Sequence, residues 1–217
     1  MPHDVKRLYK FGGAALVASG LLLLSRAILD RGAGAPPSSG VEVLAWIASN
    51  SLALKFDSEI LFFPAVCLVP ALIALYQSLA DVDRVKAAIG CGVVALVIPV
   101  LAVTLVVHGR LVYTVYGIRA STPDVAALVV AVFYGGMHAI YLLLAVGTLV
   151  LSLAMTHGAY GKPTAYCGLV TAVVDVIAAY PDAIRPTLTM VSQAFVAAWF
   201  VMVGGQLYRM RVQTVAA

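Results

Sequence analysis

Charged residues are scarce in this chain. Only 11% of its 217 residues are Asp, Glu, Lys or Arg, whereas 62% are hydrophobic. A water-soluble domain is typically about a quarter charged and about half apolar. Folding in water could not hide this much apolar surface, so the composition excludes an ordinary soluble domain. It indicates a lipid bilayer as the solvent.

Cysteine pairs and complete catalytic motifs are also lacking. The three cysteines, Cys67, Cys91 and Cys167, fall in apolar runs and form no Cys-x-x-Cys pair. An odd number at such spacing supports neither a disulfide framework nor a zinc knuckle, and no cofactor is indicated. Neither Gly-x-Ser-x-Gly nor Ser-x-x-Lys is present, and no lysine lies within an apolar run. Nucleophilic catalysis therefore has no recognisable frame, and we expect a non-enzymatic protein.

Positive charge is not concentrated anywhere along the chain. The formal net charge is +4, but the 14 Lys and Arg residues are scattered near the ends of apolar runs, without interleaved aromatic residues. This pattern gives no support for a nucleic-acid partner. Membrane lipid is the partner that the composition predicts.

What the chain does contain is a series of long apolar runs, without the strict alternation that is typical of half-buried strands. A helix of about 20 apolar residues crosses the ~30 Å hydrocarbon core of a bilayer. The runs predict an all-α integral membrane bundle, a single domain over residues 1–217 with six transmembrane helices. Their expected ranges are 11–29, 60–80, 87–107, 125–155, 164–180 and 188–208.

Two further segments shape the predicted bundle. Residues 41–55, VEVLAWIASNSLALK, are too short and too polar to span, and they predict a short interfacial helix with Trp46 at headgroup depth. The Thr-Pro-Asp sequence at 122–124 is typical of a helix start with a capping Thr. The helix that follows is ~46 Å long and exceeds the bilayer. We expect it to tilt, to bend near Gly135 and Gly136, or to project into the membrane interface, and the glycine pair favours the bend.

Six spans place both termini on one side of the membrane. That side carries eight basic residues: Lys6, Arg7, Lys10, Arg84, Lys86, Lys162, Arg209 and Arg211. The opposite side carries five, which are Arg31, Lys55, Arg110, Arg119 and Arg185. Because basic residues favour the cytoplasmic side, we expect cytoplasmic termini in a plasma (inner) membrane protein.

Ionisable residues within or beside the spans gather in the outer half of the predicted bundle. Arg26 lies near the outer end of the first span, Asp57 and Glu59 open the second, and His108 and Arg110 close the third. Each has an ordinary structural interpretation. The two acids fit a helix cap and first turn, and Arg26 can extend toward the headgroups. The pair at 108 and 110 suits an interfacial anchor.

His138 and Asp175 lie deeper in their spans. A charged side chain at the centre of a span costs about 2.5–3.5 kcal/mol, so such residues usually face the bundle interior and find partners. We expect His138 and Asp175 to hydrogen-bond to each other, directly or through water. Tyr134 and Tyr141 share the helix face of His138, and Thr171 shares that of Asp175. The pair is a structural contact, a ligand or proton site, or part of a metal site.

The two functional alternatives draw on overlapping residues. A ligand or proton site would use His138, Asp175, Tyr134, Tyr141, Thr171, Glu59 and Arg26. A metal site would use His108, His138, Asp175 and Glu59. Spacing gives the metal site little support, because no His-x-x-x-His or Glu-x-x-His motif places two ligands one helical turn apart.

Three apolar stretches carry a resemblance to a known family. They are ALIALYQSLADVDR at 71–84, GGMHAIYLLLAVGTLVLSLAMTHGAYGKPTAYCGLVTAV at 135–173 and AWFVMVGGQLYRM at 198–210. They resemble bacterial multi-span membrane proteins of the domain of unknown function 4386 type. The resemblance implies a six-helix bundle. It implies no activity and transfers no functional residue.

These features predict an accessory or ligand-binding membrane subunit with a polar pocket in its outer half. We expect it to form a homo-oligomer or to bind another membrane protein. Two alternatives remain. A proton-linked transporter of a small solute would use Asp175 and His138 as titrating groups. An intramembrane metalloenzyme would place His108, His138 and an acid around an activated water molecule.

Overall fold

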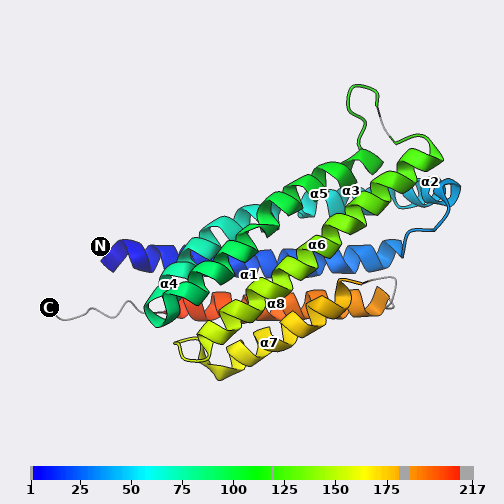
Figure 1. Cartoon of the computed structure of the whole chain (residues 1–217). Helices are drawn as coiled ribbons and strands as arrows, with labels where there is room; N and C mark the ends of the chain where they lie inside the picture. Colours follow the sequence, from blue (N-terminus) through cyan, green and yellow to red (C-terminus); the bar gives the residue numbers. More distant parts are fainter. Residues whose placement is uncertain (1, 119, 181–185, 211–217) are drawn as a thin grey trace.

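The computed structural model describes residues 2–118, 120–180 and 186–210, and all regular secondary structure in these residues is helical. Figure 1 shows the helices gathered into one elongated bundle. They are α1 (Pro2–Ala33), α2 (Gly40–Ser49), α3 (Ser51–Ile60), α4 (Phe62–Ala95), α5 (Val97–Val112), α6 (Pro123–Met155), α7 (Gly161–Ala178) and α8 (Pro186–Arg209). The prediction of an all-α fold is confirmed.

Each predicted span coincides with helix in the structure. Within the described residues, four stretches are long and apolar enough to cross a membrane: Asp4–Ala33, Ser51–Val112, Pro123–Met155 and Thr189–Arg209. The second of these runs through α3, α4 and α5. The 18-residue α7 is not among the four. Several helices that are long and apolar enough to cross a membrane are therefore present, as predicted, but the count of six is not confirmed.

The long helix α4 consists of two helices joined at a kink. At Asp83 the backbone has φ −154° and ψ 92°, outside the helical region. The Asp83 carboxylate accepts a hydrogen bond of 3.0 Å from the Lys86 backbone N–H and pairs with the Lys86 ammonium. An acidic side chain that caps the backbone in this way starts the second helix. The kink falls in the segment 81–86, between the predicted spans 60–80 and 87–107.

The helix after this turn is itself interrupted at Leu96, where α4 ends and α5 begins. Proline has no N–H, so Pro99 cannot donate to the carbonyl of Ala95 four residues earlier. At the break itself, the Leu96 N–H donates to the Val93 carbonyl three residues earlier, at 3.1 Å, and this turn is tighter than that of an α-helix. The predicted span 87–107 is thus one path made of two helical pieces.

The helix α6 continues through Gly135 and Gly136 without a break. Thr122 occupies the N-cap position with Pro123 next to it, but the Thr122 side chain makes no capping hydrogen bond. Gly136 serves packing instead. A Cβ atom there would lie 2.5 Å from Thr104 Oγ1 on α5. The glycine therefore lets the two helices approach closely.

The segment expected to form one interfacial helix folds as the two short helices α2 and α3. Trp46 Nε1 donates to the Ala33 carbonyl at the end of α1, at 2.9 Å. Val43 and Ile47 of α2 are buried in a small apolar cluster that includes Leu54 of α3. Trp46 therefore ties α2 to the end of α1.

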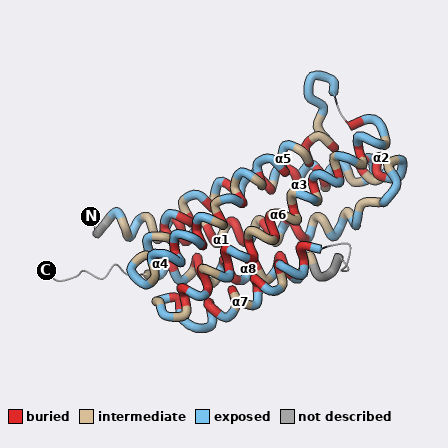
Figure 2. Tube along the Cα trace, in the orientation of Figure 1, coloured by how far each residue is buried: buried red, intermediate tan, exposed pale blue. Residues whose placement is uncertain are grey.

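The buried residues lie inside the bundle (Figure 2), and most of them are apolar. The antiparallel helices α1 and α8 touch at Gly13 and Gly204, where a Cβ on Gly13 would lie 2.6 Å from the Gly204 carbonyl oxygen. The outward faces are apolar as well. Val103, Leu128 and Val173 each expose at least 60% of their surface. Apolar side chains so widely exposed suit contact with lipid.

Candidate functional site

Arg26 stands in the interior of the bundle. Its side chain extends from α1 and the residue is 1% exposed, so the prediction that it reaches the headgroups is wrong. Arg26 Nη2 lies 2.7 Å from Asp30 Oδ2, one helical turn further along α1. Arg26 Nε lies 3.0 Å from Asp57 Oδ1 on α3. One guanidinium therefore contacts two carboxylates from two helices.

Asp57 is the acid that the sequence interpretation placed in the wrong role. It lies in the last turn of α3 and is 2% exposed, so it does not cap the start of a span. Besides Arg26 it faces His108 of α5, whose Nε2 lies 3.5 Å from Asp57 Oδ2. Asp57 and His108 thus bring α3 and α5 to the same point of α1.

Glu59, which the sequence favoured as a site residue, is exposed and takes no part in this contact. It lies beside Tyr113 at the end of α5. Partial burial and the Glu59 carboxylate together raise the pKa of the Tyr113 phenol. Glu59 therefore belongs to the surface of the bundle.

The helix α6 adds an aromatic ring to the buried charges. The Arg26 guanidinium carbon lies 5.5 Å from the centre of the Phe133 ring, within the range of a cation–π contact. The His108 ring lies on the same Phe133, with 4.3 Å between ring centres. Tyr134, a predicted site residue, packs edge-to-face against Phe133 at 5.1 Å and is partly buried. The ring of Phe133 therefore stacks with both cation-forming side chains.

Gln193 of α8 completes the cluster. In the amide orientation that satisfies its neighbours, its nitrogen donates to the Leu23 carbonyl at 2.8 Å. Its oxygen then accepts from the Tyr141 hydroxyl at 2.7 Å and from Arg26 Nη1 at 3.3 Å. Tyr141, predicted as a site residue, is thereby linked to Arg26 through one amide.

We refer to these residues together as the Arg26 cluster. Its members come from α1, α3, α5, α6 and α8, and they are Arg26, Asp30, Asp57, His108, Phe133, Tyr141 and Gln193. The cluster holds one guanidinium and two carboxylates, so it is one negative charge in excess while His108 is neutral. Neither Asp57 oxygen accepts an aligned hydrogen bond, although both are close to a positively charged or ionisable group.

Asp175 is fully buried, as predicted, but its partner is on α8. It accepts a hydrogen bond of 2.5 Å from the Ser192 hydroxyl through Oδ1, and Oδ2 has no partner in the protein. His138 is only half-buried, and its Nδ1 lies 2.5 Å from the Ala179 carbonyl oxygen after α7. The His138 ring also packs on Tyr180, 5.2 Å between centres. The direct His138–Asp175 hydrogen bond expected from the sequence is wrong.

Thr171, the remaining predicted site residue, joins α7 to α8. Its hydroxyl donates to the Cys167 carbonyl at 2.8 Å and approaches the Phe195 carbonyl at 3.4 Å. Thr171 and Asp175 therefore share a face of α7, as predicted, and that face packs on α8.

The four residues of the predicted metal site do not converge. Glu59 is exposed, His138 is held by the Ala179 carbonyl, and His108 has Asp57 as its acidic neighbour. Among the described residues no three His, Cys, Asp or Glu side chains are grouped as metal ligands. This arrangement favours a proton or structural role for the buried ionisable groups.

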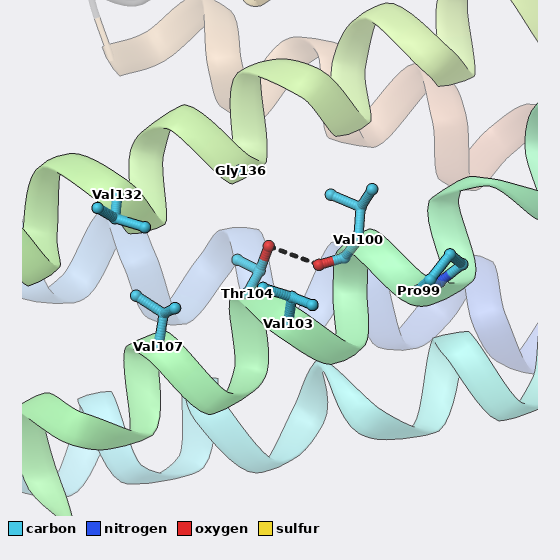
Figure 3. A pocket seen from close by; sticks show the side chains of 7 residues that line it. All are labelled: Pro99, Val100, Val103, Thr104, Val107, Val132 and Gly136. Atoms are coloured by element: carbon cyan, nitrogen blue, oxygen red, sulfur yellow. Dashed lines mark hydrogen bonds between the residues drawn. The ribbon is translucent and has the colours of Figure 1, made fainter.

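The grooves on the bundle lie away from the Arg26 cluster. One, of about 360 Å³, lies between α5 and α6 and is lined by Pro99, Val100, Val103, Thr104, Val107, Val132 and Gly136. Figure 3 shows that its polar side chain, Thr104, already donates to the Val100 carbonyl. A second, of about 310 Å³, lies between α1, α7 and α8, toward the end of the bundle that holds the start of α1 and the end of α8, and is called the inner groove below. Neither groove opens onto the polar group of the outer half, which the sequence predicted to form a pocket.

Comparison of the chain with protein-family models, with curated proteins and with solved structures finds no match. The four candidate membrane-crossing helices and the apolar outer surface define the class, that of α-helical membrane proteins. The resemblance to the domain of unknown function 4386 type stays a prediction.

The sequence did not predict five of the residues described above as part of a site: Asp30, Asp57, Phe133 and Gln193 of the Arg26 cluster, and Ser192 beside Asp175. Asp57 resembled a cap, while Gln193 and Ser192 are neutral residues in an ordinary apolar run. Only their burial, at 5% exposure or less, marks them. A sequence signal did exist for Asp57, since it is an acid close to an apolar run, but nothing in the pattern singled it out from Glu59.

Proposed function

We propose that this protein is a proton-responsive subunit of the inner membrane, in which the Arg26 cluster binds the proton. The ligand site expected from the sequence would then be a proton site inside the bundle, with Asp30 at its partly exposed edge. The protein would act as an accessory subunit whose helix packing changes with protonation, alone as a homo-oligomer or beside another membrane protein.

The observation that carries this proposal is the state of Asp57. Its carboxylate is 2% exposed and lies near Arg26 and His108, yet no aligned hydrogen bond stabilises it. A carboxylate in the hydrophobic interior is expensive unless it is paired and hydrogen-bonded. Arg26 is shared with Asp30, so one proton on Asp57 would make the cluster neutral and leave the Arg26–Asp30 pair intact.

The charged and titratable groups around Asp57 come from several elements. Arg26 and Asp30 of α1, His108 of α5 and Tyr141 of α6 belong to the cluster. Tyr134 of α6 is the further phenol near it. Protonation of Asp57 would remove the attraction that holds α3 to α1, and we expect α3 to move relative to α1.

Spin labels on the two helices test this response. We expect the distance between labels at Ile28→Cys on α1 and Phe56→Cys on α3, both exposed positions, to change with pH in a protein whose native cysteines are replaced. Asp57→Asn, which removes the charge, should hold the distance at its protonated value at every pH.

The matched control is a label pair at Leu128→Cys and Val146→Cys, both on α6, whose separation should not change. A label distance between α1 and α3 that is independent of pH in the parent protein would contradict the proposal. So would a pH response that survives in Asp57→Asn.

Six passes with cytoplasmic termini are part of the same proposal. Two observations support the six passes. The turn at Asp83 divides the stretch Ser51–Val112 into two, and the 18 residues of α7 fall within the range of about 17–25 residues that can span a bilayer. The end of the bundle that holds the start of α1 and the end of α8 (Figure 1) carries Lys6, Arg7, Lys10, Arg84, Lys86, Lys162 and Arg209. The opposite end carries Arg31, Lys55 and Arg110. Arg119, Arg185 and Arg211, also counted in the sequence, lie outside the described residues.

A proton-linked carrier of a small solute is the second candidate function. It is favoured by Asp175, a fully buried acid with one oxygen that lacks a partner. For this candidate, Asp175→Asn in proteoliposomes should abolish pH-driven uptake of the solute. Uptake that is unchanged in Asp175→Asn would remove this residue from the transport mechanism.

A further inference from the structure

Buried hydroxyl groups continue from the Arg26 cluster toward the inner end of the bundle. On α6, Tyr141, Thr148 and Ser152 are spaced by seven and four residues, which places them on one face of the helix. All three are at least nine-tenths buried. This face of α6 therefore keeps polar atoms inside the bundle along three helical turns.

A matching row lies on the neighbouring helix α7. Thr164, Thr171 and Asp175 are spaced by seven and four residues, and each is 2% exposed or less. Gly168 lies between them at the same helical spacing. The polar row on α7 thus has a position without a side chain near its centre.

The two rows meet at Gly168, where α8 joins them. A Cβ atom on Gly168 would collide with Ser152 Oγ of α6 and with Trp199 Nε1 of α8. Both polar atoms therefore point to the same place on α7. Ser152 is 0% and Trp199 1% exposed, and neither polar atom has a hydrogen-bond partner in the protein.

Both ends of the polar row reach a surface. At the outer end the Arg26 cluster includes Asp30, whose side chain is 32% exposed. At the inner end Thr164 lines the groove of about 310 Å³, together with the exposed Gln206 and Arg209. The first and last residues of each row, on α6 and on α7, are eleven positions apart, or roughly 16 Å along the helix. They lie between the cluster and the inner groove.

We infer that the interface of α6, α7 and α8 is a hydrated proton path from the Arg26 cluster to the inner groove. Buried polar atoms rarely lack partners, and a buried water molecule typically makes about three hydrogen bonds. Water along this interface satisfies Ser152 Oγ, Trp199 Nε1 and Asp175 Oδ2 together. The inference rests on the proposed function in one respect: it takes Asp57 as the source of the proton.

Conduction along the path needs no other reactant. Each water or hydroxyl oxygen forms an O–H bond with the arriving proton and releases another proton to its neighbour. The oxygen ends with the bonds it began with, and nothing is oxidised or reduced. Thr148 and Ser152 hold the waters in line, and Asp175 stabilises the positive charge in passage.

Proton flux into proteoliposomes tests the path. With a potassium gradient and valinomycin to balance charge, the wild type should acidify vesicles that hold a pH-sensitive dye. The double variant Thr148→Val, Ser152→Ala should lose the flux down to the rate of protein-free vesicles. Thr156→Val, on the last turn of the same helix with its hydroxyl bonded to the Leu153 carbonyl, should keep it. Wild-type flux no greater than that of empty vesicles overturns the inference, as does full flux in the folded double variant.

Radiolytic footprinting of the wild type gives a second measurement that needs no variant. Hydroxyl radicals form at bound waters, so Trp199 should be oxidised despite its 1% exposure. The less buried Trp46 should be oxidised as well and serves as the reference. Full protection of Trp199 overturns the hydrated path. Flux that persists in Asp57→Asn but is lost in the double variant contradicts the proton site and supports the path. A pH response of the spin labels without any flux supports the proton site and contradicts the path.

Discussion

At the scale of single residues, the pair of Arg26 and Asp57 dominates the interior of this protein. Two charges taken out of water lose several kcal/mol of hydration each, and their attraction offsets this loss only with good geometry. Here the guanidinium is divided between Asp57 and Asp30, and the Asp57 oxygens have no aligned donors. An apolar pair of similar size would pack there without that penalty, which is why we assign the charges a proton-binding role.

Replacement of Arg26 by leucine should therefore destabilise the protein strongly. Arg26→Leu leaves Asp57 buried without its cation, and breaking one side of a buried pair costs about 3–5 kcal/mol. The melting temperature in detergent, measured by circular dichroism, should fall clearly. Asp57→Leu in addition should restore part of the loss, because the acid then left without its cation is Asp30, whose side chain is 32% exposed.

Arg31→Leu is the control for that variant. Arg31 lies five residues further along α1 and is exposed, and its Nη1 lies 3.7 Å from the Met190 sulfur. Its replacement should change stability by less than about 1 kcal/mol. Equal melting temperatures for Arg26→Leu and Arg31→Leu would show that the buried pair contributes no net stability.

The partners of these residues could not be read from the sequence. Arg26 on α1 and Asp57 on α3 are separated by a loop and the helix α2, and their contact depends on how α3 packs against α1. The partner of His138 is a backbone carbonyl at Ala179, which leaves no trace in a pattern of side chains. The burial of Asp175 was predictable because an acid within a span must face the interior.

At the scale of helices, glycine decides which pairs come closest. Gly13 and Gly204 bring the backbones of α1 and α8 into contact, and Gly136 admits Thr104 of α5. In a membrane, helix association relies on such close van der Waals packing because lipid tails are as apolar as the helices. The adjacent Gly205 faces open space.

The neighbouring glycines of α8 allow a matched test. A Cβ on Gly204 would lie 2.6 Å from the Gly13 carbonyl oxygen, so Gly204→Ala should separate α1 from α8. Overpacking of this kind typically costs about 1–3 kcal/mol. Gly205→Ala meets no atom and gains up to about 1 kcal/mol of helix propensity. Thermal unfolding should place Gly204→Ala below, and Gly205→Ala at or above, the wild type; the reverse order would contradict the α1–α8 packing.

Helix positions were largely predictable because they depend on local signals. Long apolar runs mark α1, α6 and α8, and the polar turn at 81–86 marks the kink of α4. The break at Leu96 also has a local cause in Pro99, but an apolar run conceals it. The role of Gly136 was not predictable, since a glycine can bend a helix or admit a neighbour, and only the position of Thr104 decides between the two.

At the scale of the whole molecule, the arrangement in the membrane is the property to test. Tyr116, 99% exposed, lies in the loop between α5 and α6, and the exposed Lys162 lies at the start of α7. With six passes these two positions are on opposite sides. A membrane-impermeant maleimide should label Tyr116→Cys in intact spheroplasts, and Lys162→Cys only after permeabilisation. Labelling of both from the same side would contradict this topology.

The central claim is that the Asp57 carboxylate takes up a proton inside the bundle. Carbon-13 NMR of protein labelled at Asp and held in lipid nanodiscs follows each carboxyl carbon as the pH changes, and Asp57→Asn assigns the Asp57 signal by its loss. Asp83, in a turn where Lys86 donates to it, serves as the reference. We predict that the Asp57 signal moves to the position of a protonated acid while the protein stays folded. A signal that remains that of a carboxylate at every pH at which the fold persists would contradict the claim.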